Sequence, residues 1–374
     1  MIAVCTECAT RSGAAVGYCA CGGVRVIERP ISGERSCGSV WPPTPLIRSR
    51  IPGLDDVFLK YENGHLSGSF KDRVMRVAIA ALATSPPAGV VVPSSGNAAL
   101  AAAAAGARAG LQVFAIVPVG TPVARVAPVT ARGATVIQAG NDPSEAYRAA
   151  GLAAVALDLA QLYSTFAAPS AEWSCRMIGI EAVDQLGCEP TAVVAPISAG
   201  PVLVGTGHGV TQQSGGSLPA LIAVQPHGCC PITQAFEEGA DEVLPWSAPI
   251  ETSATSIADR LSGYPQDGTY TLRLLRQSGG LAASVSDEEM QAARSALLRF
   301  DGVDAELSAA AGVAWLMRGG LPRPVGPTLC VLTASGFKHT YSGDFPSSPS
   351  FPQRETAMRI CEIASAHGID ARPI

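Results

Sequence analysis

The chain has 374 residues, enough for two domains or one large one, with 47% hydrophobic and 15% charged residues. This balance excludes an intrinsically disordered protein and favours a globular one with a sizeable core. The formal net charge is −5 and no cluster of Lys and Arg is present, which argues against nucleic acid as a partner.

The first residues, MIAVCTECATRSG, lack the basic and then apolar pattern of a secretory signal. The apolar stretch 100–117 is interrupted by Arg108 and by two glycines, so we interpret it as buried globular structure, not a membrane span. The eleven cysteines are an odd number, which favours a reducing compartment over a disulfide framework. We therefore expect a cytoplasmic protein without membrane contact.

Four cysteines near the N-terminus have the spacing C-x2-C-x10-C-x-C: Cys5, Cys8, Cys19 and Cys21. Two close pairs separated by about ten residues suit a tetrahedral Zn²⁺ site made of four thiolates. Such a site is structural, because no coordination position stays open. The alternative is chance spacing in a Cys-rich chain.

After a Pro-rich joint at 41–45, the pattern predicts strands that alternate with helices. A helix begins near Phe70, and apolar strands are expected at 90–92, 112–118 and 134–140. A second series has strands at 191–198, 221–226 and 328–336 and an amphipathic helix at 287–300. This alternation predicts two open, doubly wound, mostly parallel α/β sheets. Beyond residue 342 we expect a flexible linker before a last helix.

Three loops are expected at the carboxyl ends of strands: 94–97, 198–201 and 333–336. Ligands of open α/β sheets bind at such ends. The loop Ser94–Asn97 offers backbone N–H groups, hydroxyls and an amide, which suit a carboxylate or a phenolic oxygen. The alternative is an ordinary helix-capping loop.

Lys71 stands at the start of the helix predicted after Phe70. The positive end of a helix disfavours an ammonium group and would lower the pKa of this amine. A neutral lysine is a nucleophile toward a carbonyl and forms a Schiff base. The alternative is an ordinary surface lysine.

The motifs SGSFKDR and PSSGNAALAAAAAGARAG together resemble the threonine synthases, within the fold-type II enzymes that use pyridoxal 5′-phosphate (PLP), the tryptophan synthase β superfamily. The resemblance continues through IAVQPHGCCPITQAFEEG, SGGLAASVSDEEMQAA, GVDAELSAAAGVAWL and VLTASGFKH. It implies that Lys71 forms the Schiff base with PLP and removes the substrate α-proton, and that Asn97 contacts the cofactor 3-oxygen. It also implies substrate binding by the loop Ser94, Ser95, Gly96, Asn97 and Ala98.

The resemblance places Thr333 beside the pyridine nitrogen of PLP. A hydroxyl does not hold that nitrogen protonated as a carboxylate would, which suits eliminations and replacements. Glu306 matches an acidic position of the family, with a helix-start residue as the alternative. The cofactor phosphate is expected on the loop ISAGPVLVGTG, where Pro201 removes one donor. The expected phosphate-loop residues are Ser198, Ala199, Gly200, Val202 and Leu203.

The substrate-phosphate segment of threonine synthases departs from the family pattern here. It reads SAEWSCRMIG, in which Arg176 is a candidate replacement for the family's lysine and the upstream arginine is absent. Ala98 also stands where the family often has Thr. We therefore expect elimination or replacement on a small amino acid, with an O-phosphorylated or O-acylated substrate among the candidates. Open alternatives are a serine/threonine dehydratase-like ammonia-lyase, a divergent β-replacement enzyme and an inactive amino-acid- or PLP-binding protein.

From the resemblance we expect a homodimer with the cofactor in an interdomain cleft. The expected domains are a zinc-ribbon-like appendage at 1–29, a large PLP-binding domain at 30–75 and 186–374, and a small domain at 76–185. The small domain would carry the SSGN loop.

Overall fold

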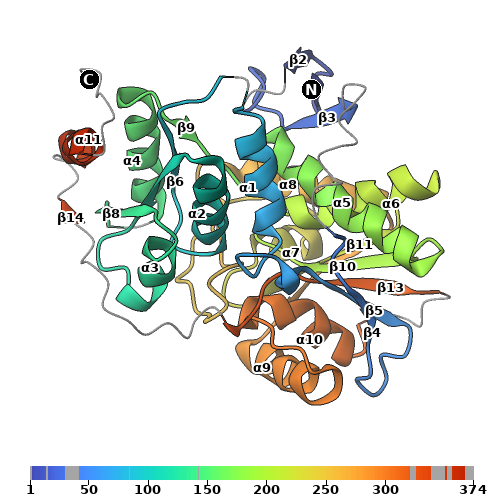
Figure 1. Cartoon of the computed structure of the whole chain (residues 1–374). Coiled ribbons are helices and arrows are strands. Elements are labelled where there is room, and N and C mark those ends of the chain that lie inside the picture. The colour runs from blue at the N-terminus through green and yellow to red at the C-terminus, as the bar shows by residue number, and fades with distance from the viewer. Residues whose placement is uncertain are drawn as a thin grey trace. The chain divides into compact units, whose positions relative to one another are not determined.

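A computed structural model describes residues 2–13, 16–29, 42–83, 85–141, 143–320, 326–337, 350–351 and 356–366. The described chain divides into two compact units, shown by their elements in Figure 1. The first unit comprises Met1–His65 and Thr165–Phe337, and the second comprises Leu66–Ser164 and Lys338–Ile374. Among the described residues, no helix is both long and apolar enough to cross a membrane.

The first unit begins with a small antiparallel sheet, which we call the ribbon (residues 2–29). Its strands are β1 (Ile2–Cys5), β2 (Arg11–Gly13) and β3 (Arg25–Arg29), in the order β2-β1-β3. Cys5 and Ile27 are buried in this sheet. The four cysteines of the predicted metal site lie at the end of β1 and in the ribbon's two turns.

The main sheet of the first unit has six strands in the order β12-β11-β10-β13-β5-β4. All neighbours are parallel except the edge pair β4–β5. The central strands β10 and β13 are buried along their whole length, as expected for a sheet covered on both faces. The strands are β4 (Leu46–Arg48), β5 (Val57–Tyr61), β10 (Ala192–Pro196), β11 (Ala220–Pro226), β12 (Leu281–Val285) and β13 (Thr328–Leu332).

Helices α5 and α6 lie on one face of this sheet, and α9 and α10 lie on the other (Figure 1). The helices of the unit are α5 (Pro169–Leu186), α6 (Pro201–Ser214), α7 (Pro231–Glu237), α8 (Pro265–Gln277), α9 (Asp287–Ala296) and α10 (Ala311–Met317). Short turns of helix are η2 (Glu62–Gly64), η3 (Leu297–Asp301, a π turn) and η4 (Leu307–Ala310). The predicted helix at 287–300 therefore ends in a π turn. Ser286 starts it with a capping box that includes Glu289.

The second unit has a five-stranded, all-parallel sheet in the order β14-β8-β7-β6-β9. Helix α4 packs across several of its strands, and α11 packs on α4. The elements are α1 (Lys71–Ala80), β6 (Gly89–Val92), α2 (Asn97–Ala109), β7 (Gln112–Val117), α3 (Val123–Thr130), β8 (Thr135–Ala139), α4 (Pro143–Ala156), β9 (Ala160–Gln161), β14 (Ser350–Phe351) and α11 (Thr356–Ala366). The two α/β sheets expected from the sequence are confirmed. The linker expected beyond residue 342 lies largely outside the described residues.

The boundaries of the compact units differ from the predicted domain ranges. Residues 165–185, expected in the small domain, lie in the first unit, whereas residues 66–75 lie in the second. The packing of α5 along α6 explains the first difference. A β-carbon on Gly209 would lie 1.9 Å from Arg176 O, and one on Gly179 would lie 2.1 Å from Thr206 O. These glycines let the two helix backbones approach closely, so α5 belongs with α6.

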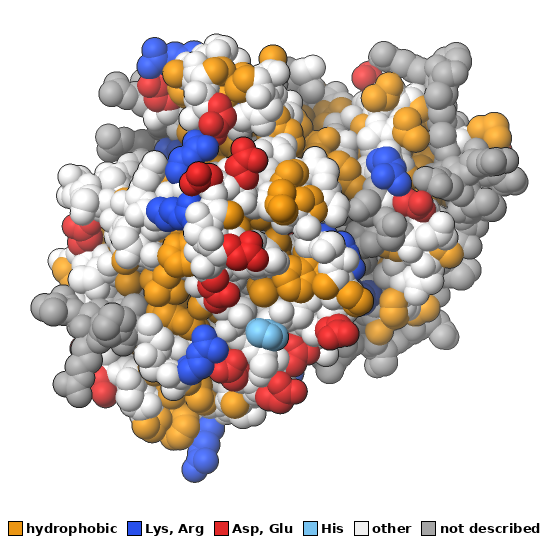
Figure 2. Space-filling model, turned by 180° about the vertical axis from the view of Figure 1, so that it is seen from behind, with side chains coloured by type: hydrophobic (Ala, Val, Ile, Leu, Met, Phe, Trp, Pro, Cys, Tyr) orange, Lys and Arg blue, Asp and Glu red, His pale blue; other side chains and the backbone are white. Residues whose placement is uncertain are grey.

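Acidic and basic side chains lie beside one another on the face of the molecule in Figure 2. Among the side chains described there, that face carries no continuous basic area of the kind that binds a nucleic-acid backbone.

Candidate active site

Lys71 is the first residue of α1, in the second unit. The turn before it is held by Asp72, whose carboxylate accepts hydrogen bonds from the backbone N–H (3.0 Å) and hydroxyl of Ser67. Lys71 Nζ lies 3.4 Å from the Ser164 carbonyl oxygen and 4.6 Å from the centre of the Phe70 ring. The amine thus has a defined, partly apolar environment at a helix start.

Ser69 adds an unusual feature two residues before Lys71. Its side chain is fully buried, and its hydroxyl has no hydrogen-bond partner among the described residues. A buried polar group without a partner is costly in a folded protein, so such groups often mark a ligand site.

The chain has only three lysines, Lys60, Lys71 and Lys338. Lys60 is fully buried in β5, where its amine donates hydrogen bonds to Glu181, Gln185 and the Thr44 carbonyl at 2.8 Å each. It is therefore committed to a structural ion pair that joins β5 to α5. Lys338 lies outside the described residues. Lys71 is the described lysine in a position suited to covalent chemistry.

The SSGN loop joins β6 to α2 in the same unit as Lys71. Ser94 Oγ accepts a hydrogen bond from Gly96 N at 3.1 Å, and Asn97 is the first residue of α2. Helices α1 and α2 pack against each other. Ser95 is half-buried and Ala98 is buried. The predicted strand–loop–helix arrangement is confirmed, and the first N–H groups of α2 lack intrahelical partners, as at every helix start.

The predicted phosphate loop joins β10 to the 14-residue helix α6 in the first unit. Side chains of neighbouring elements hold its carbonyl groups. Gln225 Nε2 donates to Ser198 O at 3.3 Å, and Thr271 Oγ1 donates to Ala199 O at 2.7 Å. The first turn of α6 leaves backbone N–H groups, including those of Val202 and Leu203, without intrahelical partners. N–H groups at a helix start bind phosphate.

Gly200 is the residue of this loop that no other amino acid can replace without strain. Its φ is +114°, and a β-carbon there would lie 2.2 Å from Thr271 Oγ1. Ala199, Val202 and Leu203 are buried. Backbone donors at a helix start, with no side chain at Gly200, fit a phosphate group. The residues present therefore fit the cofactor phosphate.

Thr333 directly follows β13, which pairs in parallel with β10. Because the carboxyl ends of neighbouring parallel strands meet at one edge of a sheet, Thr333 and the 198–203 loop lie at the same edge. Thr333 is buried, with 7% of its surface exposed. The loop after Thr333 forms an antiparallel bridge between Ser335 and Ala305. In addition, Glu306 N donates a hydrogen bond to Ala334 O at 2.9 Å.

Arg176, considered from the sequence as a substrate-phosphate ligand, is held inside the first unit. Glu172 accepts two hydrogen bonds from its guanidinium at 2.9 Å, and Arg176 also donates to Ile27 O in β3. His208 Nδ1 lies 2.8 Å from the same carboxylate. Burial alone would raise the pKa of Glu172, but the charges and hydrogen bonds of Arg176 and His208 lower it to about 2. Arg176 thus joins α5 to the ribbon, and Glu172 joins α5 to α6 through His208.

The four ribbon cysteines are brought together as predicted. Their sulfur atoms lie within 4.8 Å of one another, with contacts of 3.4 Å, 3.5 Å and 3.6 Å. Sulfur atoms in a tetrahedral zinc–thiolate site are about 3.8 Å apart, given Zn–S bonds of about 2.3 Å. The donor set therefore fits Zn²⁺.

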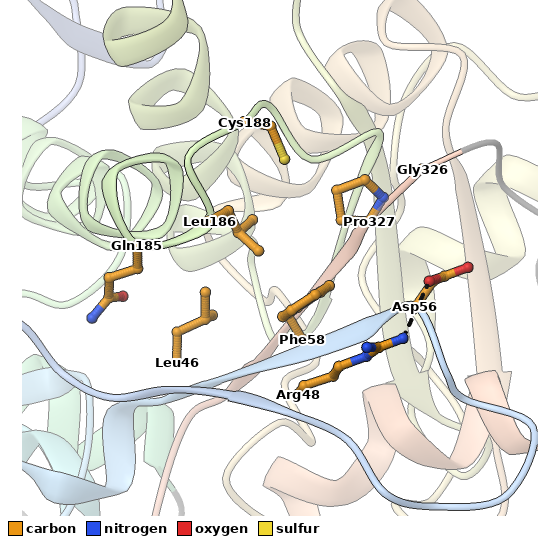
Figure 3. A pocket seen from close by; sticks show the side chains of 9 residues that line it. All are labelled: Leu46, Arg48, Asp56, Phe58, Gln185, Leu186, Cys188, Gly326 and Pro327. Atoms are coloured by element: carbon orange, nitrogen blue, oxygen red, sulfur yellow. Dashed lines mark ion pairs between the residues drawn. The ribbon is translucent and has the colours of Figure 1, made fainter.

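A pocket of about 600 Å³ lies elsewhere on the first unit (Figure 3). Pro327, which precedes β13, is one of its lining residues, so the pocket lies at the opposite end of that strand from Thr333. The exposed ion pair Arg48–Asp56, 3.9 Å apart, lies at its side. No predicted site residue lines this pocket.

Sequence reasoning missed Thr271, Gln225 and Ser69. Gln225 bonds Ser198 O and also accepts hydrogen bonds from Ile232 N and Thr233 N. Thr271 reaches the loop from α8, 72 residues away in the chain. No local motif marks a residue that acts from another element. The buried hydroxyl of Ser69 lies inside the SGSFKDR motif, so the motif itself was the one available signal.

The comparisons with known proteins give matches over most of the chain. Residues 40–335 match the family described as "Pyridoxal-phosphate dependent enzyme". The chain is 32% identical to threonine synthase of Methanosarcina acetivorans over 71% of this chain and 66% of that protein. It is 31% identical to threonine synthase of Synechocystis sp. over 79% of this chain and 75% of that protein.

Among solved structures, the chain is similar to a threonine deaminase from the organism abbreviated "T.th.", with a TM-score of 0.68. The likeness covers 82% of this chain and 94% of that one at 24% identity. At this identity the likeness shows a shared fold.

Proposed function

This chain belongs to the family of pyridoxal-phosphate-dependent enzymes, and on that premise we propose that it catalyses elimination or replacement on an amino acid. The observation that carries the proposal is Lys71 at the start of α1, in the same unit as the SSGN loop. Threonine synthase activity is one candidate within this class of reactions. It is supported by sequence similarity to proteins of that name.

Lys71 is the proposed catalytic residue. PLP, when bound, supplies an electron sink that stabilises negative charge on the substrate α-carbon. Lys71 is the residue that would hold the cofactor through its Nζ, and its amine would serve as the base for the substrate α-proton. Phe70 and the Ser164 carbonyl limit where its amine can lie, which favours proton transfer at one position.

The other residues orient the cofactor. We assign the phosphate to Ser198, Ala199, Gly200, Val202 and Leu203, because this loop offers backbone donors at the start of α6. Asn97 is assigned to the 3-oxygen and Thr333 to the pyridine nitrogen. A neutral threonine hydroxyl favours departure of a leaving group over long-lived negative charge on the ring.

The substrate is proposed to be a small amino acid with a leaving group at Cβ or Cγ. Its carboxylate binds the residues 94–98. An O-phosphoryl or O-acyl leaving group is proposed from the resemblance of the sequence motifs to those of threonine synthases. Arg176 is not assigned to it, because Glu172 already pairs with its guanidinium.

Three further features belong to the proposal. Cys5, Cys8, Cys19 and Cys21 are assigned to a structural Zn²⁺, on the support of their mutual distances. A homodimer and a cytoplasmic location stay predictions from the family resemblance and the sequence. The same holds for the domain ranges 1–29, 30–75 with 186–374, and 76–185.

The covalent role of Lys71 is tested by the visible absorbance of the protein purified with PLP. The wild type is expected to be yellow, and Lys71→Ala is expected to lose the band. Lys338→Ala is the control, since Lys338 is the remaining lysine of the chain besides Lys60 and Lys71. Borohydride treatment followed by peptide mass spectrometry identifies the modified lysine directly.

A colourless wild type after incubation with PLP, or a cofactor attached to a lysine other than Lys71, contradicts the assignment. Turnover of O-phosphohomoserine, O-acetylhomoserine, O-phosphoserine and O-acetylserine, assayed by release of the leaving group, then decides between β and γ chemistry. Absence of turnover of every amino acid by a yellow protein favours the inactive binding protein.

A further inference from the structure

The ribbon contacts helix α8 at two places within the first unit. Glu7, in the turn between Cys5 and Cys8, accepts hydrogen bonds from the Arg273 guanidinium at 2.8 Å and 3.2 Å. Tyr18, which precedes Cys19, lies near enough to the fully buried carboxyl of Asp267 to lower its pKa, and Phe166 N donates a hydrogen bond to that carboxyl at 3.0 Å. Each of the ribbon's two cysteine turns therefore provides one contact to α8.

Helix α8 in turn supports the 198–203 loop. Thr271 lies one helical turn after Asp267, so the two side chains share a face of α8. Thr271 Oγ1 donates to Ala199 O at 2.7 Å and lies against Gly200. A shift or rotation of α8 therefore moves a group that holds the loop's backbone.

Both ribbon contacts lie next to cysteines of the metal site in the chain. Glu7 N donates to Cys5 Sγ at 3.4 Å, so Glu7 is placed by a metal-ligand sulfur. Gly17, next to Tyr18, donates to Ala167 O at 2.7 Å and accepts a hydrogen bond from Arg25 at 2.6 Å. Without a metal, four thiols do not hold two turns together, because small metal sites fold with their ion.

We propose that the ribbon with Zn²⁺ bound positions the 198–203 loop for the cofactor phosphate, acting through Tyr18 and Glu7 on α8. The inference rests on the proposed function, because it assigns that loop to PLP. Tyr18, Glu7, Asp267 and Arg273 are positioning residues, and none of them touches the cofactor. Zinc removal accordingly weakens PLP binding, although no cysteine is a cofactor ligand.

The first arm of the test measures the dissociation constant of PLP by fluorescence titration. Tyr18→Phe and Glu7→Gln are each expected to weaken PLP binding about two- to tenfold, the loss expected for one hydrogen bond. Zinc removal with a chelator is expected to have at least as large an effect. Arg11→Ala is the matched control, since its ion pair with Glu28 joins two ribbon strands and does not reach α8.

A charge exchange separates positioning from general damage. Glu7→Arg with Arg273→Glu restores an ion pair in the reverse sense, so it is expected to recover most of the affinity that either single change loses. Unchanged PLP affinity in Tyr18→Phe and in the zinc-free protein overturns the inference. A wild type that takes up no Zn²⁺ overturns it as well.

The second arm does not require PLP. Amide hydrogen exchange is measured with and without Zn²⁺, and exchange in residues 198–204 and in α8 is expected to rise on zinc removal. Helix α9 is the internal control, because it packs on the opposite face of the sheet from α6 (Figure 1). If the wild type binds no PLP, the proposed function fails, while the exchange data still decide the link from ribbon to loop. Equal exchange in both states overturns that link.

Discussion

Thr271 Oγ1 lies 2.2 Å from the position that a β-carbon on Gly200 would take. The hydroxyl also donates a hydrogen bond to Ala199 O, one residue earlier in the same loop. Helix α8 thus packs directly on the backbone of the predicted phosphate loop. This contact requires glycine at position 200, where the φ of +114° is also unfavourable for any other residue.

Gly200→Ala is expected to lower the free energy of unfolding by about 2–4 kcal/mol and to weaken PLP binding. The added methyl group clashes with Thr271 and strains the backbone. Urea unfolding and PLP titration measure the two effects. Gly215→Ala is the matched control, because Gly215 ends the same helix at φ +71° with open space around it, so we expect a loss of about 1 kcal/mol. If both variants lose the same free energy of unfolding, the close contact between Gly200 and Thr271 adds nothing to the cost of the substitution.

Asp267→Asn is expected to stabilise the protein above neutral pH. Burial raises the pKa of Asp267 to about 7, although the interactions with Tyr18 and Phe166 N act to lower it. Since the folded pKa lies above the ordinary value of 3.8, stability falls as the pH rises from about 4 through about 7. Asparagine carries no charge, so at pH 8 we expect a gain of about 2–4 kcal/mol that shrinks toward pH 4.

Asp287→Asn provides a control of opposite sign. Burial alone would raise the pKa of Asp287, but hydrogen bonds from Thr252 and Ser253 lower it. That carboxylate therefore contributes stability above its unfolded pKa, and the contribution is lost as the pH falls. Its asparagine variant is expected to be less stable at pH 8 and to approach the wild type in acid. Urea unfolding at several pH values measures the free energy of unfolding of both variants. If that free energy changes with pH in the same way in both, the raised pKa of Asp267 is refuted.

Arg176→Met is expected to destabilise the protein by about 3–5 kcal/mol, because it leaves the buried Glu172 carboxylate without its main partner. The double variant Glu172→Leu with Arg176→Met is expected to recover much of this loss, since it removes both charges. Arg48→Met breaks an exposed ion pair and serves as the control, with a change below about 1 kcal/mol. If Arg176→Met unfolds like the wild type but loses affinity for an O-phosphorylated substrate, Arg176 is a substrate ligand after all.

Cys8→Ser is expected to lose Zn²⁺ from protein purified under reducing conditions, because three thiolates bind the ion more weakly than four. Cys188→Ser removes an exposed cysteine outside the ribbon and is expected to keep the full zinc content. Elemental analysis of the three proteins provides the measurement. A wild-type protein without zinc would contradict the predicted zinc site and favour chance as the explanation of the cysteine spacing.

The strand order could not be predicted from the sequence, although most strands could. The pattern of apolar segments predicted strands at 328–336 and 191–198, and β13 and β10 lie within these ranges. Their pairing with each other joins segments 136 residues apart, as the Ala192–Thr328 register shows. An apolar pattern predicts a buried strand but does not predict which strand it pairs with. The strand pairing in the fold therefore shows that Thr333 and Gly200 lie at the same edge of the main sheet.

The structural role of Arg176 was not anticipated, for a similar reason. Its position in the chain suggested a substrate ligand, whereas packing of α5 on α6 and β3 commits it to Glu172 and Ile27. The partner Glu172 is four residues away and was visible in the sequence. The complete burial of Glu172 could not be predicted from the sequence. Because an unpaired buried charge is strongly destabilising, this burial is the reason why Glu172 requires Arg176 as a partner.

The sequence by itself determined the chemistry that this chain is able to perform. A lysine at a helix start, a small polar loop after a strand and four closely spaced cysteines are local patterns, because each depends on residues near one another in the chain. Only the tertiary structure decided which side chains support those groups. Thr271, Gln225 and the Tyr18–Asp267 contact act across long sequence separations, since their positions follow from how helices pack on the sheet.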